Sequence, residues 1–173
     1  MNKQIKSSGF PNAPFAIDVT SSDSTYASGH KTGDLKLWSY QDSKEINTLP
    51  KVHNSQITGL KFTRDGQRLI SASKDHQLIV TDLRTMKTLH TLSHQDFVMP
   101  NTSSNFALSS TEKYLCIGGQ NNSLFIFDLE KGTFYDELAD EHSTPIIGCD
   151  WDPSHSSRVV TIDSMGMCFL WEA

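Results

Sequence analysis

The sequence predicts an all-β protein assembled from four copies of one small antiparallel sheet. Three observations predict this fold class. Similar segments recur along the 173 residues, short stretches of alternating polar and apolar residues are separated by hairpin-turn residues, and no helical periodicity of useful length competes with them. Because self-similarity at a fixed period is the signature of repeat architectures, the period is the most informative feature of the chain.

Four aligned segments define the repeat, and each has one marker position near the end of a predicted strand. These markers are Trp38, Thr81, Phe127 and Trp171. They stand 43, 46 and 44 residues apart. A histidine precedes three of the four units, at His53, His94 and His142.

The second unit shows how each repeat is built. Residues 56–62 alternate polar and apolar side chains, and the turn residues Arg64 to Gln67 follow them. Further strands are expected at 68–73, 77–82 and 87–92. Four strands joined by hairpins form one antiparallel blade of a propeller.

The repeated segments resemble the WD40 family over roughly Phe15 to Trp171. The resemblance implies a WD40-type β-propeller of four blades, with repeats at about 15–52, 53–93, 94–141 and 142–173, and an N-terminal segment at 1–14. In that family a histidine, a serine, an aspartate and a tryptophan hydrogen-bond to one another within a blade. Such a network suits the chemistry, because buried aspartate and histidine need partners and the indole N–H only donates.

The resemblance gives structural roles to seven residues, namely Trp38, His53, Ser73, Asp75, His94, His142 and Trp171, with Ser71 as the alternative to Ser73. No unit is expected to hold all four network residues. Thr81 replaces tryptophan in the second unit, and Thr32 and Met165 stand where aspartate is expected in the first and fourth. We therefore expect apolar packing to contribute more to stability than the polar network does.

A narrower resemblance covers the last two and a half repeats. Residues 79–85, 123–132, 142–154 and 169–171 resemble the C-terminal half of the autophagy-related protein 16-like propeller. This implies a module that recruits other proteins as part of an autophagy adaptor. The alternative is a structural WD40 subunit of a large multiprotein assembly.

Composition narrows the class of partner and the compartment. The net charge of −5 and the scattered basic residues predict no direct nucleic-acid binding, because phosphate contacts need clustered Lys and Arg. No apolar run approaches the ~18 residues of a membrane span, and no secretory signal is apparent after Met1. The three cysteines form no CxxC pair, which is typical of a reducing compartment. We expect other proteins as partners and a cytoplasmic location.

Candidate chemistry is sparse. The seven histidines show no metal-ligand spacing, and those that recur at the repeat period are expected to be structural. Cys149 stands near His142 and Asp150, but its apolar neighbours indicate a buried strand residue and not a nucleophile. The sequence therefore predicts no catalytic, cofactor or metal site, and a protein that is not an enzyme.

Candidate partner-binding residues precede the turn between the second and third strands of each unit. By resemblance these positions project onto one face of the ring, and they are Lys31, Lys74 and Gln120, with Ser164 in the fourth unit. The two lysines favour an acidic peptide, although ordinary solvated turn residues explain them equally well. In the long loop from Gln95 to Asn105, Phe97 and Met99 either pack under the blade or bind a partner.

The number of repeats leaves the closure of the ring open. A seven-bladed ring at this spacing needs roughly 300 residues. The last blade is expected to lack its outer strand, unless the N-terminal segment from Met1 to Phe10 supplies one. Three alternatives follow: a piece of a larger propeller, a closed ring of four blades, or two chains joined head to tail as a homodimer with eight blades.

Overall fold

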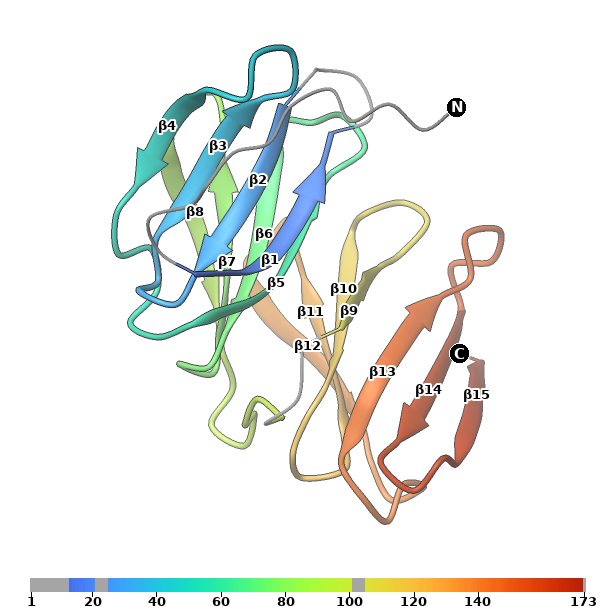
Figure 1. Ribbon diagram of the computed structural model, residues 1–173. Coiled ribbons are helices and arrows are strands. Elements are labelled where there is room, and N and C mark those ends of the chain that lie inside the picture. The colour runs from blue at the N-terminus through green and yellow to red at the C-terminus, as the bar shows by residue number, and fades with distance from the viewer. Residues whose placement is uncertain (1–12, 21–24, 101–104, 173) are drawn as a thin grey trace, which may run out of the picture.

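The computed structural model describes residues 13–20, 25–100 and 105–172, and within these ranges all regular structure is β. In this described part of the chain, fifteen strands form four antiparallel sheets, each built from strands that follow one another in sequence. Figure 1 shows the sheets succeeding one another as blades along an open arc. The prediction of an all-β, four-bladed fold is confirmed.

Each blade is a meander whose strands pair with their neighbours in sequence. Blade 1 contains β1 (Pro14–Val19), β2 (Thr25–His30), β3 (Leu35–Ser39) and β4 (Glu45–Leu49). Blade 2 contains β5 (Ile57–Phe62), β6 (Arg68–Ser73), β7 (Gln77–Asp82) and β8 (Lys87–Leu92). Blade 3 contains β9 (Phe106–Leu108), β10 (Tyr114–Gly118), β11 (Leu124–Asp128) and β12 (Thr133–Leu138). Blade 4 contains β13 (Ile146–Trp151), β14 (Arg158–Asp163) and β15 (Cys168–Glu172).

Blade 4 is a three-stranded sheet within the described residues, with β15 at its edge. This matches the expectation that its outer strand is missing from the sequence pattern. The segment from Met1 to Phe10, expected as a possible closing strand, lies outside the described residues.

The hydrophobic core lies between blades. One cluster joins blades 1 and 2, a second joins blades 2 and 3, and a third joins blades 3 and 4. Successive side chains of a strand point to opposite faces, so each inner blade offers one apolar face to the blade before it and another to the blade after it. Phe97 and Met99 are buried in the second cluster, so the interpretation that they pack under the blade is confirmed.

Small residues let neighbouring blades approach closely. A Cβ atom added to Gly29 of β2 would lie 2.3 Å from Cγ2 of Ile57 on β5. A Cβ atom added to Gly118 of β10 would lie 2.6 Å from Cγ2 of Ile146 on β13. The isoleucine at the start of the next blade therefore fills the space that a side chain at the glycine would need.

Candidate partner-binding surface

A histidine network fixes the loop that precedes blade 2. Nδ1 of His53 lies 3.1 Å from both carboxylate oxygens of Asp75, and its Nε2 lies 2.8 Å from Oγ of Ser71. The Asp75 carboxylate also accepts the backbone N–H of Asn54. Burial alone would raise the pKa of Asp75, but the hydrogen bond and charge of His53 hold that pKa below its ordinary value.

The serine that contacts His53 is Ser71, whereas Ser73 accepts the backbone N–H of Asp75. Side chains on one strand alternate between faces, so Ser71 and Ser73 share a face of β6 but lie at different distances from the imidazole ring of His53. The sequence offered both residues, and only the packed geometry separates their contacts.

Blade 4 holds a more complete network than the sequence predicted. The buried His142 bonds Oδ2 of Asp163 at 3.0 Å and Oγ1 of Thr161 at 2.7 Å. The indole N–H of Trp171 donates to the same threonine oxygen at 2.8 Å. The expectation that Met165 occupies the aspartate position is wrong, because the carboxylate comes from Asp163 at the end of β14.

The hydrogen bond from His142 lowers the pKa of Asp163, and the backbone N–H groups of Met165 and Met167 add to the effect. Histidine, threonine, aspartate and tryptophan are thus all present in one blade. The prediction that no unit holds all four network members is corrected by this arrangement. The repeat period places the expected carboxylate at residue 165, two residues beyond Asp163.

Blades 1 and 3 use other contacts at the same places. In blade 1, Oγ of Ser28 accepts the indole N–H of Trp38 at 2.8 Å and lies 2.9 Å from Nε2 of His30. Thr32, which stands where aspartate is expected, donates its hydroxyl to the carboxylate of Asp34. In blade 3, the ring of His94 stacks on Phe134 with centroids 4.2 Å apart.

The four candidate partner-binding residues occupy equivalent positions in the four blades. Each is exposed just after the second strand of its blade. In blades 1, 2 and 4 its backbone N–H donates to the residue just before the first strand, whereas in blade 3 the backbone N–H of Gln120 donates to the carbonyl of Val98 in the loop before blade 3. The donors are Lys31, Lys74, Gln120 and Ser164. The structure therefore places these side chains at one end of the blades, beside the loops that the histidine networks hold.

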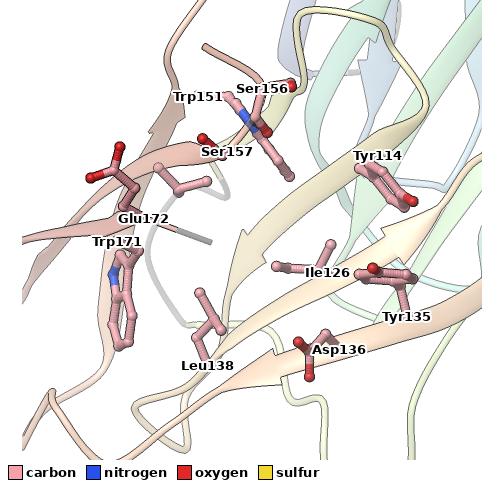
Figure 2. A pocket seen from close by; sticks show the side chains of 11 residues that line it. Tyr114, Ile126, Tyr135, Asp136, Leu138, Trp151, Ser156, Ser157, Trp171 and Glu172 are labelled. Atoms are coloured by element: carbon pink, nitrogen blue, oxygen red, sulfur yellow. Dashed lines mark hydrogen bonds between the residues drawn. The ribbon is translucent and has the colours of Figure 1, made fainter.

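A second candidate surface was missed by the sequence reasoning: an aromatic groove between blades 3 and 4. The groove encloses about 300 Å³ and is lined by Tyr114, Ile126, Tyr135, Asp136, Leu138, Trp151, Ser156, Ser157, Val159, Trp171 and Glu172. Figure 2 shows the tyrosines on one side and the tryptophans on the other. No sequence signal marks this site, because its lining comes from six strand segments of two blades.

The aromatic groove is held in shape by contacts among its own residues. Trp151 donates its indole N–H to the carbonyl of Ser156 at 2.8 Å, and its ring stacks on Tyr114 at a centroid distance of 6.5 Å. The ring centroids of Tyr114 and Tyr135 lie 4.7 Å apart, and the interaction with Tyr114 raises the pKa of Tyr135. The carboxylates of Asp136 and Glu172 stand at the groove. The groove can receive an apolar side chain that carries or adjoins a positive charge.

The described residues hold no group of three His, Cys, Asp or Glu side chains arranged to bind a metal ion. Within the same ranges, no helix is long and apolar enough to cross a membrane. Cys149 is buried with its sulfur 3.7 Å from that of Cys116, and burial raises the pKa of the Cys116 thiol. Its place in a core strand agrees with the interpretation that Cys149 is a packing residue.

Comparison with known proteins identifies the repeat. The family described as WD domain, G-beta repeat matches residues 43–82. Residues 43–82 form a WD40 repeat. The matched stretch begins just before β4 of blade 1 and ends with β7 of blade 2. A sequence repeat therefore spans two blades, which ties each blade to the next through one continuous segment.

Among curated relatives, the chain is 29% identical over 156 residues to "Autophagy-related protein 16" of Arabidopsis thaliana, covering 90% of this chain and 30% of that protein. It is 26% identical to "Protein Atg16l2" of Mus musculus, covering 91% of this chain and 25% of that protein. It is 30% identical to "Eukaryotic translation initiation factor 3 subunit I" of Bombyx mori over 59% of this chain and 29% of that protein.

The chain thus spans about a quarter to a third of the length of these curated relatives. The WD40 repeat and the autophagy-related relatives support a protein-interaction scaffold with protein partners. This agrees with the scaffold function that the sequence predicts.

Proposed function

We propose that this chain is the non-catalytic WD-repeat recruitment module of a cytoplasmic autophagy adaptor. The observation that carries the proposal is the likeness to autophagy-related protein 16 sequences, which covers about nine-tenths of the chain. We further propose that the repeats divide at about 15–52, 53–93, 94–141 and 142–173, with 1–14 as a preceding segment.

Two surfaces are proposed to receive partners. The end of the blades that carries Lys31, Lys74 and Gln120 would take an acidic peptide, because two of these exposed side chains are positive. The aromatic groove would take an apolar side chain of a partner, because rigid aromatic rings bind apolar groups with little loss of conformational freedom. One scaffold could then hold two partners on separate surfaces.

A chimera tests the autophagy role. The segment of Arabidopsis autophagy-related protein 16 that matches this chain is replaced by this chain, and the chimera is expressed in plants that lack the native protein. We expect the chimera to restore starvation-induced autophagosomes. A chimera with Tyr135→Ser, which removes an exposed ring from the aromatic groove, is expected to restore fewer.

The matched control carries Tyr40→Ser, because Tyr40 is 58% exposed and Tyr135 is 56% exposed. Tyr40 follows β3 in blade 1 and does not line the aromatic groove. A stable, normally expressed chimera that restores no autophagosomes contradicts the autophagy role. Equal effects of the two tyrosine substitutions contradict the role of the groove.

A second candidate function is a structural subunit of a large assembly. The likeness to a translation initiation factor 3 subunit favours it, since that match reaches 30% identity. In this case the tagged chain would sediment with particles of megadalton size in fed and starved cells alike. Sedimentation only as a small species would exclude this second function.

A further inference from the structure

The two ends of the arc expose surfaces that have the same design as the interfaces inside it. We call the surface of a blade that meets the preceding blade its leading face, and the surface that meets the following blade its trailing face. In blades 1 to 3 the trailing faces are buried, and their equivalent positions stand eleven, nine, three and one residues before each marker. In blade 2 these residues are Ile70, Ala72, Leu78 and Val80.

Blade 4 has apolar residues at all four of these trailing positions, namely Val160, Ile162, Cys168 and Leu170. All four are exposed, and Leu170 reaches 66%. The apolar pattern that is buried on the trailing faces of blades 1 to 3 is therefore exposed on the trailing face of blade 4. An apolar blade face of this kind is an interface without its partner.

The leading face of blade 1 shows the complementary feature. Ile17 and Val19 stand at the positions that Leu60 and Phe62 occupy in the leading face of blade 2. Ile17 is 63% exposed and Val19 is 51% exposed. Since both faces remain exposed within one chain, blades 1 and 4 of the same molecule do not cover each other.

One position shows which partner fits. At the junctions of blades 1 with 2 and of blades 3 with 4, a trailing glycine receives a leading isoleucine. The exposed trailing face of blade 4 has the large Ile162 at the glycine position. The leading face of blade 1 has Pro14 at the isoleucine position, because Pro14 pairs with the end of β2 as Ile57 pairs with the end of β6.

Compared with the inner junctions, the large residue of this potential junction, Ile162, lies on the trailing face, and the smaller one, Pro14, lies on the leading face. A blade that led with isoleucine, as blades 2 and 4 do, would meet the Ile162 side chain where only a glycine leaves room. The shorter Pro14 ring leaves space for Ile162. Blade 1 of a second copy therefore fits the trailing face of blade 4 better than a blade built like blades 2 or 4.

We propose that two copies of this chain join head to tail through these faces and close an eight-bladed ring with twofold symmetry. Each copy places the trailing face of its blade 4 on the leading face of blade 1 of the other copy, so the same contact forms twice. Eight blades lie within the range of known propellers. Closed twofold symmetry is the commonest form of protein assembly.

The mass in solution is the first test. Light scattering coupled to size exclusion should give twice the 19.3 kDa of one chain. A mass of 19.3 kDa at every concentration overturns the proposal. A mass that keeps growing with concentration shows open chains and overturns the closed pair.

Two variants then test the head-to-tail geometry. Leu170→Asp places a charge on the trailing face, and Ile17→Asp places one on the leading face. Each variant alone should be monomeric, with a β-sheet circular dichroism spectrum and cooperative unfolding. An equimolar mixture should regain a two-chain species, because one intact leading face and one intact trailing face remain.

The matched control is Leu89→Asp, since Leu89 is 45% exposed on the outer strand β8 and belongs to neither face. This variant should keep the mass of the unaltered chain. If Ile17→Asp fails to fold, Val19→Asp on the same strand replaces it. Loss of the pair with Leu170→Asp but not with either β1 variant would indicate contact between two trailing faces, and would overturn the head-to-tail arrangement.

Discussion

At the scale of single residues, the molecule keeps the geometry of a polar network while changing its members. Nε2 of His53 contacts a serine hydroxyl, and Nε2 of His142 contacts a threonine hydroxyl. In each case the carboxylate of an aspartate lies at hydrogen-bond distance from Nδ1, the other ring nitrogen. Thr161 also replaces the serine that receives an indole N–H in blade 1. A hydroxyl of either type meets the requirement, because both offer one donor and two acceptor sites.

Asp75→Ala should destabilise the fold. The substitution leaves the buried His53 ring and the Asn54 N–H without their acceptor, and a lost partner of this kind costs about 1–3 kcal/mol. Urea denaturation followed by tryptophan fluorescence measures the loss. Asp96→Ala is the control, since the exposed Asp96 carboxylate lies 3.8 Å from Nδ1 of His94, and an exposed ion pair of this kind is worth at most about 1 kcal/mol. Equal losses in the two variants would contradict the role of Asp75.

Acid should destabilise the protein below about pH 4. The pKa values of Asp75 and Asp163 are lower in the folded protein than the ordinary 3.8. Carboxylates with a lowered folded pKa stabilise the native state above the unfolded pKa, and this contribution is lost as the pH falls through the folded pKa. The free energy of unfolding, measured in urea from pH 6 to pH 3, should decline over the lower part of that range.

Asp75→Asn provides the comparison for the pH dependence. This variant lacks one of the two carboxylates, so its free energy of unfolding should fall less steeply between pH 4 and pH 3 than that of the unaltered chain. Parallel pH profiles would show that Asp75 does not contribute to the acid sensitivity.

At the scale of elements, the packing of each strand depends on the side chains that it presents to the next blade. Gly29 and Gly118 lie where the first strand of the following blade comes closest. The isoleucines opposite them lie at bulges, since the register of β5 and of β13 shifts directly after Ile57 and Ile146. A bulge turns one side chain toward the neighbouring blade without ending the pairing.

Gly29→Val should destabilise the contact between blades 1 and 2. Even the added Cβ would lie 2.3 Å from Cγ2 of Ile57, and overpacking of a core costs about 1–3 kcal/mol. The double variant Gly29→Val with Ile57→Ala should regain part of the loss, because the smaller alanine leaves room for the valine. Thermal denaturation compares the three proteins. A double variant less stable than the sum of both single losses would contradict this packing.

The partner-binding turns give a prediction about recruitment. Reversing the charge with Lys31→Glu and Lys74→Glu should lower the binding affinity for an acidic partner by about tenfold or more, since like charges across an interface repel. Pull-down of the partners bound by the unaltered chain measures the effect. Lys131→Glu, on an exposed residue between β11 and β12, is the control. If every partner stays bound, these turns do not form the binding surface.

At the scale of the whole molecule, the fold is a linear series in which each blade is stabilised by its neighbours. Three apolar clusters lie between the four blades, and the two outermost faces repeat the pattern without cover. Stability of the terminal blades therefore depends on what covers those faces.

Thermal stability should depend on protein concentration if two copies close the ring. Association stabilises the folded state by mass action, so the Tm should rise with concentration. The Leu170→Asp variant should show a lower Tm that does not change with concentration. A concentration-independent Tm of the unaltered chain, measured by calorimetry over a hundredfold range, would contradict the paired state.

Much of the fold could be read from the sequence because hydrophobic alternation and turn residues are local signals. The second unit was expected at 56–62, 68–73, 77–82 and 87–92, and β5 to β8 follow these ranges to within one residue. The networks were read less well. In blade 4 the period puts Met165 at the aspartate position, whereas Asp163 supplies the carboxylate, because a residue count along a turn does not fix where a side chain points.

The sequence by itself determined the repeat, the all-β class and the four blades, since period and alternation are properties of the chain. Only the tertiary structure decided which serine meets His53, that Trp151 and Tyr114 form the wall of a groove, and that Ile162 is left exposed by the described part of the chain. These features depend on contacts between blades. Residues that meet across an interface are far apart in the chain, so no local pattern records their distance.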